Sequence, residues 1–341
     1  MIIVQNIARL LEGKNVLVTG GAGFIGSNLV DAIAGCVRHA TILDNLSNGS
    51  LENLESLLSH GRDKVNFVEG DVRSPDDCLK ATRDKDIVFH LAAQISPVRA
   101  VEDPEYDFEV NARGTLNVLE AARKARVRRV VYASTNIYGN PKYLPMDENH
   151  PIDLLSPYAA AKLAGEAYSM VYCNTHGIET VRLRFCNVYG PRQTTKSESG
   201  AIMLFVEKLL DGKAPRIFGD GNQTRDFVYV SDVVDALIRS STVPEAVGEA
   251  FNIGSGVETT INDLAKTVMD IMTELTAKDF HVKPTYGTPR SADFRRARMD
   301  ISKARKLLGH EPAIMLEEGL RKTLEWRLGL QADTDPLGAR E

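Results

Sequence analysis

The chain has 341 residues, of which 43% are hydrophobic and 26% are charged, and its formal net charge is −5. This composition is ordinary for a soluble globular protein and excludes a mostly disordered chain, while the length suits about two domains or one large α/β unit. The acidic balance argues against a protein held to nucleic acid by its overall charge. No apolar stretch is long enough to predict a membrane span.

The N-terminus and the cysteines indicate a cytoplasmic protein without a metal site. Residues 1–13 start apolar but lack a basic segment and a small-residue cleavage site, so we predict no signal peptide. The four cysteines have neither CxxC spacing nor clustered histidines beside them; they are Cys36, Cys78, Cys173 and Cys186. We therefore expect reduced thiols and no bound metal ion.

Short β-rich runs alternate with helical patterns in the first half of the chain. The predicted strands are Asn15–Thr19, Ala40–Leu43, Val65–Glu69, Ile87–His90, Arg129–Ala133 and Thr180–Phe185. The predicted helices are Phe24–Ala34, Asn111–Lys124 and Tyr158–Cys173. Continuous apolar strands separated by helices indicate an α/β fold with a doubly wound parallel sheet covered on both faces. Such sheets bind ligands at the carboxyl ends of their strands.

The sequence changes character after about Asn187, where glycine, proline and charged residues become more frequent. Helical patterns recur at Ile202–Leu210, Ser231–Ser240 and Ile261–Leu275. We predict an N-terminal extension over residues 1–13, a nucleotide-binding domain over 14–186, a smaller α/β substrate-binding region over 187–328 and a tail over 329–341. Some segments of the third part are expected to return to the first domain.

A glycine motif stands between the first strand and the first helix, with Gly20, Gly23 and Gly26 in the run GGAGFIG. Glycines allow a tight turn through which backbone N–H groups approach a pyrophosphate, and the helix N-terminus adds a positive dipole. Asp44 ends the second strand, where a carboxylate binds the adenosine ribose hydroxyls and repels a 2′-phosphate. The motif therefore predicts NAD rather than NADP. Asp71 ends another strand and is either a contact to the adenine edge or a turn residue.

A second motif predicts acid–base chemistry. Tyr158 and Lys162 are four residues apart on a predicted helix and share one face. An ammonium group near a phenol lowers its pKa from about 10, which makes Tyr158 a general base near neutral pH. Ser134, at the end of the fifth strand, is expected to face the same cleft and share the substrate proton. An exposed helix pair is the alternative interpretation of Tyr158 and Lys162, and the upstream glycine motif disfavours it.

Taken together, these motifs resemble the extended short-chain dehydrogenase/reductase superfamily. Within it the chain is most similar to the NAD-dependent nucleotide-sugar epimerase/dehydratase family, and there to the UDP-glucose 4-epimerases. The resemblance covers residues 14–326. Its segments are TGGAGFIGSNLV (Thr19–Val30), DNLSNG (Asp44–Gly49), GDVR (Gly70–Arg73), HLAAQ (His90–Gln94), NARGT (Asn111–Thr115), IYG (Ile137–Gly139), SPYAAAK (Ser156–Lys162), RFCNVYGPRQ (Arg184–Gln193), FGDGNQTRDFVYVSDV (Phe218–Val233) and FNIGSG (Phe251–Gly256).

The resemblance implies a Rossmann-type fold, bound NAD and three catalytic residues. Tyr158 would take the proton of the sugar 4-hydroxyl as hydride leaves C4, Ser134 would bind the 4-oxygen and relay the proton, and Lys162 would orient the nicotinamide ribose. A 4-keto sugar would turn over and be reduced on its other face, with no net redox change. The implied NAD-binding residues are Gly20, Gly23, Phe24, Ile25, Gly26, Asp44, Asn45, Ser47, Asn48, Gly49, Asp71, Val72, Leu91, Ala92, Ala93, Gln94, Tyr158, Lys162 and Cys186.

The resemblance to this family also implies a UDP-sugar substrate. Asn187, Arg225 and Arg290 match diphosphate ligands, and bidentate arginine suits phosphate oxygens. Asp293 matches a ribose ligand, and Ile217 and Phe218 match a strand beside the uracil. At the position of a gate residue stands Ala297, whose small side chain is expected to admit an N-acetyl group. The implied substrate-binding residues are Ser134, Asn187, Ile217, Phe218, Arg225, Arg290, Asp293 and Ala297.

Several alternatives stay open. Thr135 and Asn136 replace the Asp-Glu pair of the 4,6-dehydratases, which disfavours dehydration. The basic run 295–298 suggests either an acidic sugar, and so a UDP-uronate 4-epimerase or decarboxylase, or a solvated surface. A non-catalytic NAD-binding protein is the third candidate. A homodimer through the helix that carries Tyr158 is also expected, although its apolar positions equally suit burial within one subunit; they are Ala161, Leu163, Ala164 and Ala167.

Overall fold

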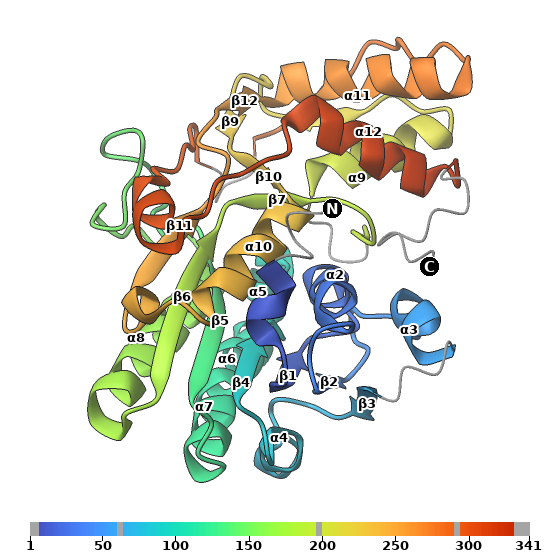
Figure 1. Ribbon diagram of the computed structural model, residues 1–341. Helices are drawn as coiled ribbons and strands as arrows, with labels where there is room; N and C mark the ends of the chain where they lie inside the picture. Colours follow the sequence, from blue (N-terminus) through green and yellow to red (C-terminus); the bar gives the residue numbers. More distant parts are fainter. Residues whose placement is uncertain (1–6, 60–63, 196–199, 290–293, 331–341) are drawn as a thin grey trace.

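The computed structural model describes residues 7–59, 64–195, 200–289 and 294–330. Its centre is a seven-stranded parallel sheet of order β11-β6-β5-β4-β1-β2-β3, in which the strand order reverses between β1 and β4 (Figure 1). The strands are β1 (Asn15–Thr19), β2 (His39–Asp44), β3 (Val65–Glu69), β4 (Ile87–His90), β5 (Arg129–Thr135), β6 (Glu179–Phe185) and β11 (Ala250–Ile253).

Helices cover both faces of this sheet, as the alternation of buried strands and helices predicts. Val16 and Val18 of β1 lie in one core with the apolar sides of α2 (Phe24–Ile33) and α10 (Val230–Ser240), whereas Leu17 lies in a second core on the opposite face. The helices of that second face are α4 (Pro75–Thr82), α7 (Gly114–Lys124) and α8 (Pro157–His176). The predicted Rossmann-type α/β fold is confirmed.

The boundaries differ from the predictions where local chemistry overrides the hydrophobic pattern. Strand β5 extends to Thr135, so Ser134 lies within the strand. Helix α8 begins earlier than predicted because the Ser156 side chain caps it and Pro157 occupies its first turn, and it ends at Gly177 in the left-handed conformation. A π-helical turn, η3 (Glu109–Arg113), precedes α7, where one continuous helix is predicted. Strand β11 is missing from the predictions because Asn252 interrupts its short apolar run.

The smaller region is built from paired short strands and three helices. The pairs are β7 (Asn187–Tyr189) with β10 (Phe227–Tyr229), β8 (Arg216–Phe218) with β13 (Thr285–Gly287), and β9 (Thr224–Arg225) with β12 (Thr259–Thr260). The helices are α9 (Ala201–Leu210), α11 (Ile261–Thr276) and α12 (Leu316–Arg327), which share a separate core. In Figure 1 they lie together above the carboxyl end of the central sheet.

Short helices complete the described chain. They are η1 (Arg9–Leu11), η2 (Leu51–Leu54), α3 (Glu55–Ser59), α5 (Pro97–Glu102), α6 (Pro104–Phe108), η4 (Pro244–Ala246) and η5 (Ala304–Leu308). Within the N-terminal extension, Ala8 and Leu11 are fully buried in the core beneath α2 and α10. Among the described residues, no helix is long and apolar enough to cross a membrane, and no cluster of His, Cys, Asp or Glu side chains is placed to hold a metal ion.

Candidate active site

A cavity of about 210 Å³ opens at the carboxyl ends of the central strands, beside the point where the strand order reverses. Parallel sheets bind ligands at this point because the loops on either side of it diverge. Every residue predicted to bind NAD lines this cavity except Cys186, and Ser134 lines it as well. The structure therefore brings the glycine motif, the strand-end carboxylates and the three candidate catalytic residues to one place.

Two glycines make the wall of this cavity possible. Gly20 has a φ of +70°, and a Cβ there would lie 2.7 Å from the backbone nitrogen of Ala92. A Cβ on Gly26 would lie 2.2 Å from the carbonyl oxygen of Gly20. Both distances are impossible for a real side chain, so only glycine lets β1, β4 and the start of α2 approach this closely. The N-terminus of α2 is left facing the cavity, where it favours an anion such as a pyrophosphate.

Asp44 is held in place by the backbone of the glycine loop. Its carboxylate accepts hydrogen bonds from the backbone N–H of Ala22 at 3.0 Å and from that of Leu46 at 2.8 Å. Burial raises the pKa of Asp44, and these two bonds oppose the rise. A carboxylate fixed at this strand end suits the ribose hydroxyls of NAD and opposes a 2′-phosphate, so the residues present fit NAD.

Asp71 lines the same cavity but is already engaged by its neighbours. It accepts hydrogen bonds from the Asn45 amide at 2.8 Å and from the Arg73 guanidinium at 2.7 Å. Burial acts to raise the pKa of Asp71, but the bonds from Arg73 outweigh it and lower the pKa to about 2. These contacts are typical of a turn residue. The proposed contact between Asp71 and the adenine edge stays a prediction.

Lys162 is buried and lies over an aromatic ring. Its Nζ is 4.4 Å from the centre of the Tyr132 ring. Burial lowers the pKa of Lys162 to about 7, and the nearby carboxylates of Glu166 and Asp107 oppose this. A buried ammonium group is stabilised when a ligand supplies oxygen acceptors for its hydrogen bonds, as the hydroxyls of a ribose do.

Tyr158 differs from the prediction in its electrostatics. Burial raises the pKa of Tyr158 to about 12, a hydrogen bond with the Thr135 side chain opposes the rise, and the charge of Asp107 adds to it. The predicted lowering of this pKa by Lys162 is wrong for the chain alone, because burial dominates. Thr135 is a partner that sequence reasoning missed. Its position directly after Ser134 at a strand end was the available signal.

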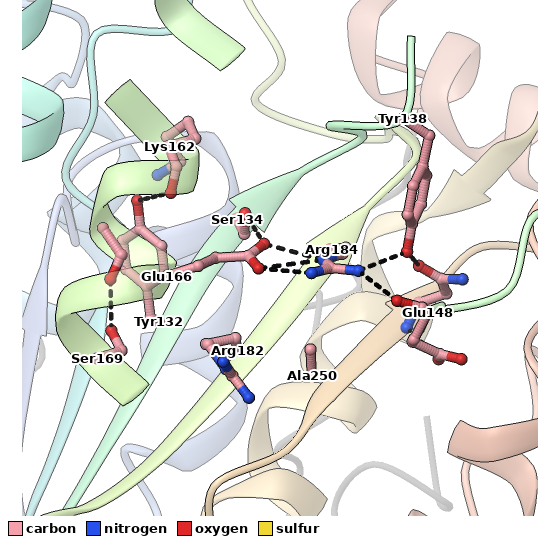
Figure 2. Close-up of polar contacts among 12 residues, drawn as sticks. Tyr132, Ser134, Tyr138, Glu148, Lys162, Glu166, Ser169, Arg182, Arg184 and Ala250 are labelled. Atoms are coloured by element: carbon pink, nitrogen blue, oxygen red, sulfur yellow. Dashed lines mark hydrogen bonds and ion pairs between the residues drawn. The ribbon is translucent and has the colours of Figure 1, made fainter. Parts of the chain in front are cut away.

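Ser134 is tied to a buried ion pair. Its hydroxyl donates to Oε1 of Glu166 at 2.6 Å, and Glu166 binds the Arg184 guanidinium with Nη2 to Oε2 at 2.7 Å (Figure 2). Glu166 is a second residue that was not predicted from the sequence. It lies four residues after Lys162, and therefore on the same face of α8, which was the signal that could have found it.

A second cavity, of about 620 Å³, adjoins the first. Tyr158 and Phe185 line both cavities, whereas Thr135 and Asn136 line only the second. Its other walls include residues predicted to bind the substrate, namely Asn187, Ile217, Phe218 and Arg225. Tyr158 therefore stands where the predicted cofactor site meets the predicted substrate site.

The remaining substrate-site predictions divide into three groups. Arg225 lines the second cavity. Its Cζ lies 4.1 Å from the centre of the Phe294 ring, and its guanidinium donates to the Phe294 carbonyl oxygen at 2.9 Å. Arg290 and Asp293 lie outside the described residues. Ala297 is 2% exposed and packs in a small apolar cluster with Tyr138, behind the cavity wall rather than on it.

The basic run beside Ala297 is not among the residues that line the cavity. Arg295 pairs with Asp220 at 2.7 Å, Arg296 pairs with Glu258 at 2.6 Å, and all four side chains keep contact with solvent. The Arg298 guanidinium donates to the Gly256 carbonyl oxygen at 2.8 Å. Of the two interpretations left open for these arginines, the structure favours a solvated surface.

Cys186 lies on the wall of the second cavity and not of the first, contrary to its grouping with the NAD-binding residues. Its thiol makes a long contact of 3.5 Å to Oδ1 of Asp226, and burial raises its pKa. A thiol held protonated in this way is not a nucleophile.

Comparison with known proteins agrees with this geometry. The family model described as "NAD dependent epimerase/dehydratase family" matches residues 16–254. The chain belongs to this family. Its cofactor is NAD, and the glycine loop and Asp44, which line the first cavity, remain the residues predicted to hold it.

Three similar proteins indicate where in the family the chain lies. It is 43% identical over 313 residues to a UDP-glucose 4-epimerase of Mycolicibacterium smegmatis, covering 91% of this chain and 97% of that protein. It is 35% identical over 323 residues to UDP-glucuronic acid decarboxylase 6 of Arabidopsis thaliana, with 93% and 90% covered. The structure of Thermotoga maritima UDP-glucose 4-epimerase with UDP-glucose superposes with a TM-score of 0.84 at 37% identity, covering 93% of this chain and all of that one.

Proposed function

We propose that the chain is an isomerase that inverts C4 of a UDP-hexose through a transient 4-keto sugar. The observation that carries this proposal is the place of Tyr158, which lines both the NAD cavity and the larger cavity beside it. A general base at that junction reaches a sugar hydroxyl on one side while the cofactor occupies the other. The 43% identity to a UDP-glucose 4-epimerase supports the same choice.

The chemistry follows from the residues at the junction. Bound NAD supplies the hydride acceptor and donor at C4 and a positive charge that favours the Tyr158 phenolate. Tyr158 takes the proton of the 4-hydroxyl and returns it after the ketone has turned over. Lys162 is buried beside Tyr158, where it binds the ribose hydroxyls and holds the cofactor in position. No second substrate is consumed, because the oxidation and the reduction cancel.

The larger cavity suits a nucleoside diphosphate sugar. Its volume of about 620 Å³ is within the range of small-molecule sites. Arg225 provides a guanidinium for a diphosphate, and Ile217 and Phe218 provide an apolar strand for the base. The proposal includes the N-acetylhexosamine pair because of the volume of this cavity and not because of Ala297, which is not among its lining residues.

A second candidate, a UDP-uronate epimerase or decarboxylase, is favoured only by the 35% identity to a UDP-glucuronic acid decarboxylase. The arginines that suggested an acidic sugar are paired with Asp220 and Glu258 at the surface. Coupled assays on UDP-galactose, UDP-N-acetylgalactosamine and UDP-glucuronate separate the candidates. Conversion of the first two supports the proposal, and conversion of the glucuronate alone overturns it.

We also propose a homodimer formed through α6 and α8. These helices pack against one another, and they leave Phe108, Tyr168 and Val171 exposed to solvent. Of the positions predicted to face a partner, Ala161 is buried within the subunit, whereas Ala167 is exposed. Sedimentation of the native protein and of Val171→Glu tests this: the proposal expects a dimer that the charge dissociates.

A further inference from the structure

Arg99 lies on the wall of the NAD cavity, and its guanidinium group has no partner of opposite charge. The residue belongs to α5, where the Ser96 side chain caps the helix by accepting from the Arg99 backbone N–H at 3.2 Å. Its side chain lines the first cavity and is exposed to solvent. Within the described part of the chain, no oxygen accepts a hydrogen bond from the guanidinium and no carboxylate pairs with it. Its five N–H donors are therefore available to a ligand.

The other charged side chains on the described wall of this cavity have opposite charges or hydrogen-bond donors beside them. They are Asp44, Asp71, Lys162 and Arg192. Asp71 pairs with Arg73 at 2.7 Å, so it is not free to neutralise Arg99. Arg192 pairs with Asp31 of α2. On the wall that the structure describes, Arg99 is thus the charged group that still lacks a partner.

The Tyr106 ring holds the Arg99 guanidinium in place. The Arg99 Cζ lies 4.1 Å from the centre of that ring, and the Arg73 Cζ lies 5.2 Å from the same centre. Tyr106 itself lines the cavity. A cation–π contact attracts the charge but supplies no oxygen acceptor, so it positions the guanidinium without satisfying its N–H groups. Because the contact already restricts the side chain, less conformational entropy is lost when a ligand binds there.

NAD offers one anionic group to such a cation. Its riboses and adenine are neutral, its oxidised nicotinamide ring is positive, and its pyrophosphate carries the negative charge. A guanidinium suits phosphate oxygens, which it binds through two parallel hydrogen bonds. The loop after β4 touches the glycine loop that is predicted to approach the pyrophosphate, since a Cβ on Gly20 would lie 2.7 Å from the backbone nitrogen of Ala92. Because α5 follows this loop, Arg99 extends from the segment that adjoins the predicted pyrophosphate site.

We propose that Arg99 is an anion-binding residue whose guanidinium, held by Tyr106, binds the NAD pyrophosphate and retains the cofactor on the protein. The pyrophosphate keeps its charge when the nicotinamide is reduced. Arg99 therefore binds the oxidised and the reduced cofactor equally, unlike a group that contacts the nicotinamide ring. The importance of this property rests on the proposed epimerase function, in which one cofactor molecule must stay bound while it takes hydride from the sugar and returns it.

The first test compares ligands that contain the pyrophosphate with one that lacks it. Calorimetry on the full-length, cofactor-free protein measures the Kd of NAD, of ADP-ribose and of adenosine for the wild type and for Arg99→Gln. We expect the Kd of NAD and of ADP-ribose to rise by about ten- to a hundredfold, as for the loss of a hydrogen bond to a charged group. The Kd of adenosine should not change. An unchanged Kd of NAD overturns the inference, and so does an equal loss of affinity for adenosine.

Two further variants separate a direct contact from a general effect of charge. Arg113→Gln removes the same charge from an exposed pair with Glu109, outside the cavity wall, and should leave all three Kd values unchanged. Arg99→Lys keeps the charge but lacks the planar guanidinium, so we expect a smaller rise in the Kd of NAD. Since Arg99 is exposed, the melting temperature of cofactor-free Arg99→Gln should stay close to that of the wild type. Equal losses of NAD affinity in Arg113→Gln and Arg99→Gln overturn the inference.

The second test follows the release of the cofactor from the holoenzyme. An excess of ADP-ribose prevents rebinding, and the rates at which NAD and NADH leave are measured separately. We expect Arg99→Gln to accelerate both by the same factor, and acceleration of only one form overturns the assignment to the pyrophosphate. Wild-type protein that converts no nucleotide sugar would overturn the proposed function and leave the binding results, and with them this inference, standing. Wild-type turnover together with unchanged NAD affinity in Arg99→Gln would overturn the inference alone.

Discussion

The two cavities meet at Tyr158, yet they are built in different ways. The walls of the NAD cavity are strand ends of one sheet, locked by glycines that admit no side chain and by a carboxylate bound to the backbone. The larger cavity is walled by short paired strands and by loops from distant parts of the chain. The first site is fixed by the fold itself, whereas the second depends on side chains that the rest of the fold does not require. Cofactor identity is therefore far easier to infer than the sugar.

The largest expected effect is at the junction. Tyr158→Phe removes the proposed general base, and turnover of UDP-galactose should fall by about 10²- to 10⁴-fold. Bound NAD and the melting temperature should be nearly unchanged, since the phenol is not needed for packing. Tyr168→Phe, on the exposed face of the same helix, is the control and should keep full activity. Retained turnover in Tyr158→Phe would contradict the assignment.

The rigidity of the NAD cavity predicts the next effect. Gly26→Ala places a methyl group 2.2 Å from the Gly20 carbonyl oxygen, so the loop and α2 must separate. Overpacking of this kind costs about 1–3 kcal/mol, and the purified protein should have lost most of its NAD. Gly35→Ala, with no atom within 4 Å of the new methyl, should retain NAD and stability. Equal NAD content in the two variants would contradict the prediction, because it would show that the glycine loop can move to accommodate the methyl group.

Substrate binding in the larger cavity should depend on Arg225 and not on the arginines of the basic run 295–298. Arg225→Gln removes a guanidinium from the wall, and KM for the UDP-sugar should rise by about ten- to a hundredfold, as for the loss of a hydrogen bond to a charged group. Arg296→Gln removes a surface pair with Glu258 and should leave KM unchanged for every nucleotide sugar. A selective loss of UDP-glucuronate turnover in Arg296→Gln would return the basic run to the substrate site.

The smallest effect is a pH dependence of NAD binding. The pKa of Lys162 is about 7 in the chain alone, and donation to the ribose hydroxyls raises it in the complex. Binding then takes up a proton between the two pKa values. Affinity should rise as the pH falls towards 7, by up to about tenfold per pH unit, and level off below. Calorimetry on cofactor-free protein checks this, with Lys162→Met expected to show a flat profile. A flat wild-type profile would mean that the ammonium does not contact NAD.

The parts predicted well from the sequence are those where local pattern and global fold agree. The six predicted strands and the glycine–Asp44 site follow from apolar runs and turn chemistry that act over a few residues. β11 was missed because Asn252 interrupts its apolar run, so the strand is recognised from its pairing with β6 rather than from its own sequence. The pKa of Tyr158 was misjudged because burial depends on packing, which helix spacing does not reveal. Glu166 and Thr135 were missed because their importance arises from contacts with Ser134 and Tyr158, not from a motif.

The central claim is that hydride leaves and returns to C4 within one closed active site. The most direct test is to incubate the purified protein, without added NAD, with UDP-galactose in deuterated buffer and to follow C4 by NMR. We predict conversion to UDP-glucose with the original hydrogen retained at C4. Deuterium at C4, or no conversion even with NAD supplied, would contradict the account.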